Sequence, residues 1–182
     1  GEWRLAPGVP LVLDVPFPGG KTVKVKVWRT RYGKRDLLLL DADLPELQSD
    51  QAYRRITEGL YPEWSGSWSR LEQYHVLGTA GMMAVQRLGQ APDLIHLNDG
   101  HSFLSVAQAI HDTMRQLRDQ DPLLGPALRF EAAFELVRAK TVFTTHTMVG
   151  AGNETVDVDD VRQYLMAILD DAYAVNRLLS LG

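Results

Sequence analysis

The sequence predicts an α/β fold in which an antiparallel β region, residues 1–47, precedes a βα portion, residues 48–182, within one domain. Residues 23–27 alternate strictly between valine and lysine, which is the period of a strand. Farther along the chain, apolar residues recur with the period of a helix. Two short apolar runs, 93–97 and 141–145, each stop at a cluster of small, polar and histidine residues. Such runs are typical of buried parallel strands that carry functional side chains at their carboxyl ends.

The N-terminal region predicts three strands joined by tight turns. Residues 11–15 and the Val-Lys segment flank a Pro-Gly-Gly turn at 18–20, which favours a hairpin. Residues 31–34 predict a second turn, and residues 36–43, with four consecutive leucines, predict a third strand. The valines should face one side of this sheet and the lysines should form its solvated face.

The rest of the chain predicts helices around the two apolar runs. The expected helices span 50–60, 69–88, 102–117 and 129–139, and a last one begins at Thr155 or Asp157 with a helical extension over 172–181. Ser102 is a candidate cap for its helix. Gly78 and Gly81 lie inside a helix at some cost in helix propensity, so we expect them to permit close packing against a neighbouring element.

The candidate site follows from the order of these elements. A strand, two helices and a second strand predict a crossover between parallel strands, so both carboxyl ends open on one edge. Asn98, Asp99, His101 and His146 should therefore meet in one cleft. This mixture of donors and acceptors suits the recognition of hydroxyl groups, as in a sugar. A nucleotide phosphate fits less well because the chain has neither a P-loop nor a glycine-rich dinucleotide fingerprint.

Composition narrows the classes of partner. The chain of 182 residues has a net charge of −4, which gives no electrostatic reason to expect nucleic acid or an anionic membrane surface. It contains no cysteine, which excludes disulfides, zinc-thiolate sites and cysteine nucleophiles. No stretch is apolar enough to span a bilayer, and the N-terminus lacks signal-peptide character. We therefore expect a cytoplasmic protein.

The two motifs resemble those of a known enzyme family. HLNDGH at 96–101 and TVFTTHTMVGAGNE at 141–154 are similar to motifs of the α-glucan (glycogen/starch) phosphorylase family, with the shorter bacterial and archaeal branch as the better likeness. The resemblance extends, in order, to segments 25–46, 56–61 and 76–89 and so covers nearly all of the chain.

The resemblance implies a segment of the N-terminal catalytic domain of an enzyme with two facing Rossmann-like domains. Such enzymes transfer the terminal glucosyl unit of an α-1,4-glucan (glycogen, starch or maltodextrin) to inorganic phosphate, giving glucose 1-phosphate. His146 matches the histidine that holds the hydroxymethyl group of the glucosyl unit, and Asp99 and His101 match residues that line the same pocket. The family also carries pyridoxal phosphate, whose phosphate group serves as proton shuttle. Its attachment lysine belongs to the C-terminal domain, which has no counterpart here.

Some features depart from the family pattern. Met148 and Gly150 stand where the family often has proline, and the family's opening glycine-rich loop has no counterpart in residues 1–35. We therefore expect an excised segment that is inactive alone, binds sugar weakly and tends to self-associate through surface that the missing C-terminal domain and other parts would cover.

Two other functions stay open at this point. One is a related glycogen or starch synthase-type glucosyltransferase. The other is a metal-dependent hydrolase in which His96 or His101 joins Asp99 and His146 as two histidines and a carboxylate. His75 and the remaining histidine, His111, are expected to be ordinary hydrogen-bonded residues.

Overall fold

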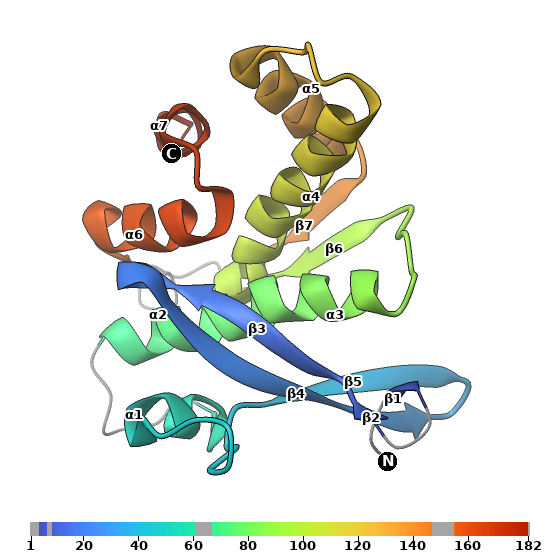
Figure 1. Ribbon diagram of the computed structural model, residues 1–182, viewed down its shortest axis with the longest axis vertical. Helices are drawn as coiled ribbons and strands as arrows, with labels where there is room; N and C mark the ends of the chain where they lie inside the picture. The colour runs from blue at the N-terminus through green and yellow to red at the C-terminus, as the bar shows by residue number, and fades with distance from the viewer. Residues whose placement is uncertain (1–3, 7–8, 61–66, 147–154, 182) are drawn as a thin grey trace.

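The computed structural model describes residues 4–6, 9–60, 67–146 and 155–181 (Figure 1). Two short strands, β1 (Arg4–Ala6) and β2 (Val9–Pro10), pair with each other in antiparallel fashion. The larger antiparallel sheet has the order β3 (Val12–Phe17), β4 (Lys21–Tyr32) and β5 (Arg35–Asp41). The expected N-terminal antiparallel region is therefore present.

The β3–β4 hairpin forms where the sequence predicts it. The turn η1 (Pro18–Gly20) is a 3₁₀ turn in which Gly19 and Gly20 have φ angles of 74° and 72°, a conformation that favours glycine. The valines of β4, Val23, Val25 and Val27, are fully buried. The lysines between them lie on the opposite face, where Lys24 pairs with Asp14 across the hairpin and the Lys26 Nζ lies 4.3 Å from the centre of the Trp28 ring.

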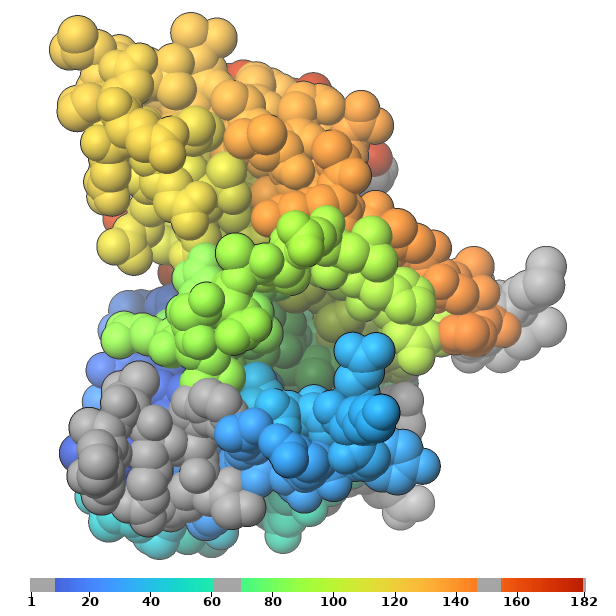
Figure 2. Space-filling model, turned by 90° about the vertical axis from the view of Figure 1, so that its right-hand side faces the viewer, coloured from blue at the N-terminus to red at the C-terminus, as the bar shows by residue number. Residues whose placement is uncertain are grey.

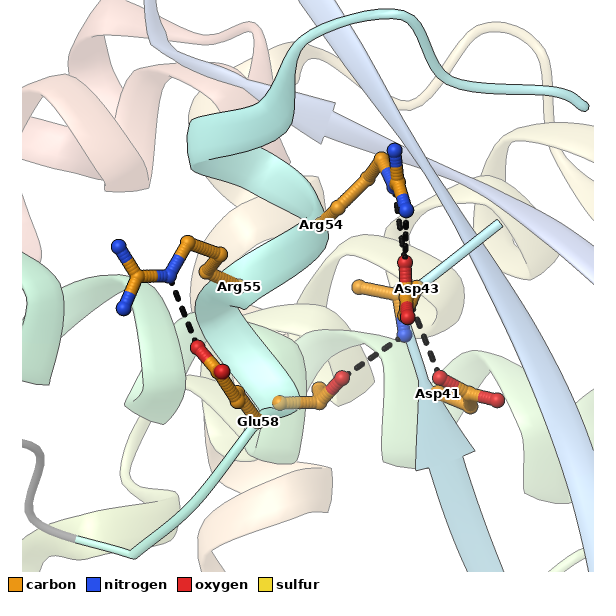
Figure 3. A network of polar contacts seen from close by, with 7 residues as sticks. Asp41, Asp43, Arg54, Arg55 and Glu58 are labelled. Atoms are coloured by element: carbon orange, nitrogen blue, oxygen red, sulfur yellow. Dashed lines mark hydrogen bonds and ion pairs between the residues drawn. The ribbon is translucent and has the colours of Figure 1, made fainter. Parts of the chain in front are cut away.

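A polar network ties the end of β5 to the helices that follow, α1 (Gln51–Arg54) and the 3₁₀ turn η2 (Arg55–Thr57) (Figure 3). The Arg54 Nε donates to Asp43 Oδ1 at 2.8 Å, and the Asp43 N–H donates to Asp41 Oδ1 at 3.0 Å. The Thr57 hydroxyl oxygen accepts from the Ala42 N–H at 3.0 Å. These bonds fix the direction in which the chain leaves the sheet.

The predicted helix 69–88 is continuous in helical conformation but changes pitch in its middle. It consists of α2 (Ser67–His75), a π-helical turn η3 (Val76–Ala80) and α3 (Gly81–Arg87). Gly78 is pressed against another helix, because a Cβ there would lie 2.6 Å from the Ser105 backbone nitrogen. A Cβ on Gly81 would meet nothing closer than Leu40 Cδ1, at 4.0 Å. The expectation of close packing is confirmed for Gly78, whereas Gly81 has room for a side chain.

The βα portion contains the expected parallel crossover. Its elements are β6 (Ile95–Asn98), the 3₁₀ turn η4 (Gly100–Ser102), α4 (Leu104–Gln120), α5 (Pro126–Arg138) and β7 (Thr141–Thr144). Strands β6 and β7 pair in parallel, with Ile95 opposite Thr141. The prediction that Ser102 caps the helix is wrong, because Ser102 lies in η4 and α4 has Phe103 at its N-cap without a side-chain bond.

Two helices complete the described chain, α6 (Val158–Leu169) and α7 (Ala172–Leu179). Asp157 caps α6 by accepting from the Asp159 N–H at 2.8 Å, as one of the two expected caps. Asp170 has a φ of 47° and ends α6, so the expected extension is a separate helix. Helix α6 contacts β3, and the core lies between the valine face of the sheet and α2, α3, α4 and α6.

His75 is a polar side chain inside this core, at 0% exposure. Its Nε2 donates to the Pro16 carbonyl at 2.7 Å, and its Nδ1 accepts from the Thr79 hydroxyl at 3.1 Å. Its ring packs edge-on against Phe17 and Tyr164. Burial lowers the pKa of His75 to about 4, so the ring is neutral at physiological pH.

The architecture is thus mixed α/β, with an antiparallel sheet and a parallel pair. Leu94, Val142 and Phe143, in and beside the parallel pair, are exposed. Figure 2 shows the side of the molecule on which β6 and β7 lie, where a hollow separates the yellow-green surface around β6 from the light-blue surface of β4 and β5. In the described part of the chain, no helix is both long and apolar enough to cross a membrane.

Candidate functional site

Strands β6 and β7 end at the same edge of the parallel pair, and Asp99 joins their ends. Asn98 lies opposite Thr144 in the register of the two strands. The next residue, Asp99, donates its backbone N–H to the Thr144 carbonyl at 2.8 Å. Its side-chain Oδ1 accepts from the backbone N–H of His146 at 2.8 Å. One aspartate therefore holds the segment after β6 against the segment after β7.

The backbone of Asp99 is strained. Its φ and ψ are 59° and −175°, a combination that only glycine adopts readily. Holding another residue there costs about 1–3 kcal/mol, and such outliers cluster at functional sites. The two hydrogen bonds of Asp99 are the contacts that oppose this cost.

His101 lies in η4, two residues beyond Asp99, with its side chain half-buried. Its ring meets the ring of Tyr74 in a T-shaped arrangement, with the centroids 5.1 Å apart and the planes at 83°. Tyr74 is buried near the end of α2. Helical periodicity accounts for a buried tyrosine in this helix but gives no signal that its ring contacts a candidate site residue.

Asn98 and His146 are exposed. Along β6, Ile95 and Leu97 point inward, whereas His96 and Asn98 point outward, as the period of a strand requires. The four predicted residues thus lie at one edge, with Asp99 in direct contact with His146 and His101 on Tyr74. Residues 147–154, which include Met148 and Gly150, lie outside the described part of the chain.

His96 belongs to a different contact. Its Nε2 lies 2.8 Å from the Thr144 hydroxyl, on the exposed face of the strand pair. Among the residues that the structure describes, no three histidine, aspartate or glutamate side chains are grouped to hold a metal ion. The metal-hydrolase alternative gains no support from this arrangement.

The amino ends of the same two strands form a separate feature. The Lys140 carbonyl accepts from the Ile95 N–H at 2.7 Å, so Lys140 lies at the edge opposite His146. A cavity of about 470 Å³ also lies there, lined by residues that include Gln86, Asp112 and Lys140. This cavity is therefore distinct from the site that the sequence predicts.

Comparison with known proteins shows which enzymes have a segment similar to this chain. No protein-family model matches the chain, and no solved structure matches it either. The chain is 31% identical over 166 residues to the glycogen phosphorylase of Mycobacterium tuberculosis (strain CDC 1551 / Oshkosh), a match that covers 88% of this chain and 18% of that protein. It is 32% identical over 163 residues to the maltodextrin phosphorylase of Thermococcus litoralis, covering 90% of this chain and 18% of that protein.

A relative with lower sequence identity is also named glycogen phosphorylase. The glycogen phosphorylase of Aquifex aeolicus is 28% identical over 160 residues, which cover 86% of this chain and 21% of that protein. The chain thus spans about a fifth of the length of these relatives. Over nearly all of its own length, the chain matches a segment of the glycogen and maltodextrin phosphorylases.

Proposed function

We propose that the whole protein to which this chain belongs is an α-glucan phosphorylase. It transfers the terminal glucosyl unit of an α-1,4-glucan to inorganic phosphate and releases glucose 1-phosphate. The described edge, with Asn98, Asp99, His101 and His146, forms one wall of the glucosyl pocket within a Rossmann-like domain. The names of the relatives and the geometry of Asp99 support this proposal.

The observation that carries the proposal is the strained Asp99 with its bond to the His146 backbone. An ionised carboxylate offers about four lone-pair sites, and one bond to an N–H leaves capacity for sugar hydroxyls. The exposed imidazole of His146 adds a ring nitrogen that can donate or accept. A hydroxyl needs both kinds of partner, because each buried polar group left without one costs about 1–3 kcal/mol.

The chain supplies one wall only. Good small-molecule sites enclose most of the ligand surface, so the remainder of the protein has to supply the facing wall. For this reason we expect the chain alone to show no phosphorolysis. The cysteine-free composition fits a reducing compartment, and we place the whole protein in the cytoplasm.

Pyridoxal phosphate, the cofactor that the family implies, does not fit the described residues of this chain. Four of the described lysines lie in or beside the β3–β4–β5 sheet, and the fifth, Lys140, lies at the edge opposite His146. None of them stands at the strand-end site. The cofactor would therefore be held by another part of the protein.

The proposal is tested by assaying the whole protein with two pairs of substrates, a glucan with inorganic phosphate and a glucan with a sugar nucleotide. With maltodextrin and inorganic phosphate we expect glucose 1-phosphate, and with a sugar nucleotide we expect no transfer. His146→Ala should lower the phosphorolysis rate at least tenfold, because it removes a group that contacts the glucosyl unit. His111→Ala, a half-buried histidine on α4, is the matched control and should stay within about twofold. Glucan elongation from the sugar nucleotide would instead identify a synthase.

A further inference from the structure

We infer that Tyr74 is a positioning residue for His101, one that sets the plane of the imidazole before any sugar arrives. This inference rests on the proposed function, because His101 matters only if the strand-end edge binds a ligand. Tyr74 itself is too buried to be counted as a sugar contact. Its influence passes through the ring of His101.

The contact geometry restricts His101 on one side. The two rings lie at 83° with centroids 5.1 Å apart, which is a favoured T-shaped arrangement. His101 is half-buried, so part of its surface is open to solvent while its ring packs against Tyr74. Rotation about the last side-chain torsion of a histidine has broad minima, so a packed ring neighbour such as Tyr74 narrows the range of that torsion.

The position of Tyr74 is fixed by the residue that follows it. His75 is buried and anchors the end of α2 to the hairpin through its 2.7 Å bond to the Pro16 carbonyl. Phe17 and Tyr164 enclose the same imidazole, with ring centroids at 4.7 Å and 4.9 Å. Tyr74 therefore projects from a backbone that is held on its other face by the core.

The position of the segment that carries His101 is restricted by a close contact between η3 and the start of α4. Directly after Tyr74 and His75 the helix widens into the π turn η3, a feature that is frequent at functional sites. Gly78 in this turn approaches the backbone of Leu104 and Ser105 so closely that a Cβ would not fit. These residues begin α4, which follows His101 by three positions. The π turn thus fixes the distance between the end of α2, which carries Tyr74, and the start of α4, which follows His101.

Preorganisation of this kind raises affinity by reducing the ordering cost on binding. A T-shaped aromatic pair of ordinary strength corresponds to a factor of about two to ten in a binding constant. We expect Tyr74→Leu to weaken binding of maltotriose to this chain by that factor. Tyr74→Phe keeps the ring and should bind within about twofold of the native chain.

The test combines two measurements on the chain itself. Nuclear Overhauser contacts and ¹³C relaxation of the histidine rings, without sugar, report whether His101 is ordered against Tyr74. A titration with maltotriose then gives the dissociation constants of the native chain and of the Tyr74→Leu, Tyr74→Phe and Tyr173→Leu variants. Tyr173 is an exposed tyrosine on α7 and serves as the control.

The expected result is an ordered His101 ring and a mobile His146 ring in the native chain, with His101 loosened in Tyr74→Leu alone. A His101 ring as mobile as that of His146 in the native chain would overturn the inference, even if Tyr74→Leu failed to fold. Equal maltotriose affinity of native chain and Tyr74→Leu would overturn it as well. If His101 is ordered by Tyr74 but neither the native chain nor any variant binds maltotriose, the proposed placement of the glucosyl pocket fails and the positioning contact stands.

Discussion

Asp99 has a strained backbone conformation and a side chain that bonds to the segment after β7. Its φ of 59° would suit glycine, yet the residue carries the carboxylate that receives the His146 N–H. Glycine at this position would relieve the strain but would lose the side-chain bond to His146. The side-chain bond to His146 offsets part of this strain, and the proposed sugar site would give the same carboxylate a second role at the strand-end edge.

We predict that Asp99→Gly is more stable than Asp99→Ala by about 1 kcal/mol. Both variants lose the bond to His146, so the difference between them isolates the backbone strain. Alanine keeps a strain of about 1–3 kcal/mol, whereas glycine relieves it and loses about 0.5–1 kcal/mol through its freer unfolded chain. Urea denaturation of the two variants measures the difference, and an alanine variant more stable than the glycine variant would show that the backbone at Asp99 is unstrained.

His75 makes stability depend on pH. Its pKa is lowered by burial from 6.5 in the unfolded chain to about 4 in the folded chain. Between these values the unfolded state binds the proton more readily, so the free energy of unfolding falls as pH decreases from about 6.5 to about 4. The full loss amounts to about 3 kcal/mol, and the stabilisation is complete above the unfolded pKa.

We expect His75→Phe to flatten this part of the pH profile. Phenylalanine keeps a ring against Phe17 and Tyr164 but leaves the Pro16 carbonyl without its donor, which lowers stability at pH 8 by about 1 kcal/mol. Acidic side chains also titrate in this range, so the comparison is the difference in slope between the native chain and the variant. Parallel profiles from pH 4 to pH 8 would mean that His75 is not the group responsible.

Among the elements, the crossing of η3 and α4 is the tightest described contact at a glycine. We predict that Gly78→Ala destabilises the fold by about 2–3 kcal/mol, because the added Cβ has backbone atoms of Ser105 and Leu104 in its way. Gly81→Ala is the matched control three residues on, where the Cβ has room. It should leave stability unchanged or raise it by up to about 1 kcal/mol, since alanine favours the helix. Thermal denaturation of both variants decides, and equal effects would contradict the close approach.

The strands and helices were largely predictable because period, turn residues and caps are local signals. The alternation of Val23 to Val27, the Pro-Gly-Gly turn and the Asp157 cap each have a counterpart in the structure. The parallel edge with Asp99 and His146 followed from the order of the elements.

Other features depend on packing that no local pattern encodes. The π turn η3 arises where a helix contacts α4, the hairpin and β5 at once, and a helical stripe does not reveal it. The contact of Tyr74 with His101 joins two elements that are far apart in sequence. Serine is a favoured capping residue, but Ser102 lies in the 3₁₀ turn that follows the strained Asp99, and α4 begins two residues later.

The whole molecule exposes apolar side chains around its parallel strands. Leu94, Val142 and Phe143 are 59%, 46% and 56% exposed, and within the described residues β7 pairs with β6 alone. An open strand edge with apolar side chains favours association with another chain. In the whole protein this surface would be available to the parts that the chain does not include.

We therefore predict that the chain self-associates in a concentration-dependent manner. Phe143→Lys should shift it toward monomer, because a charge on an edge strand opposes pairing. Leu123→Lys, at a fully exposed loop position (95%), is the control and should not change association. Sedimentation velocity over a range of concentrations measures this, and a native chain that stays monomeric throughout would remove the basis for the prediction.

The most direct test is a titration of the chain with glucose and maltotriose, followed by the amide chemical shifts. We predict saturable shifts centred on Asp99, His101 and His146, with a dissociation constant on the order of millimolar or weaker because only one wall is present. His146→Ala should abolish most of these shifts while leaving the unliganded fold nearly as stable, and His111→Ala should leave them unchanged. Sugar-induced shifts that survive in His146→Ala, or that centre on the amino edge around Lys140, would contradict the placement of the glucosyl site.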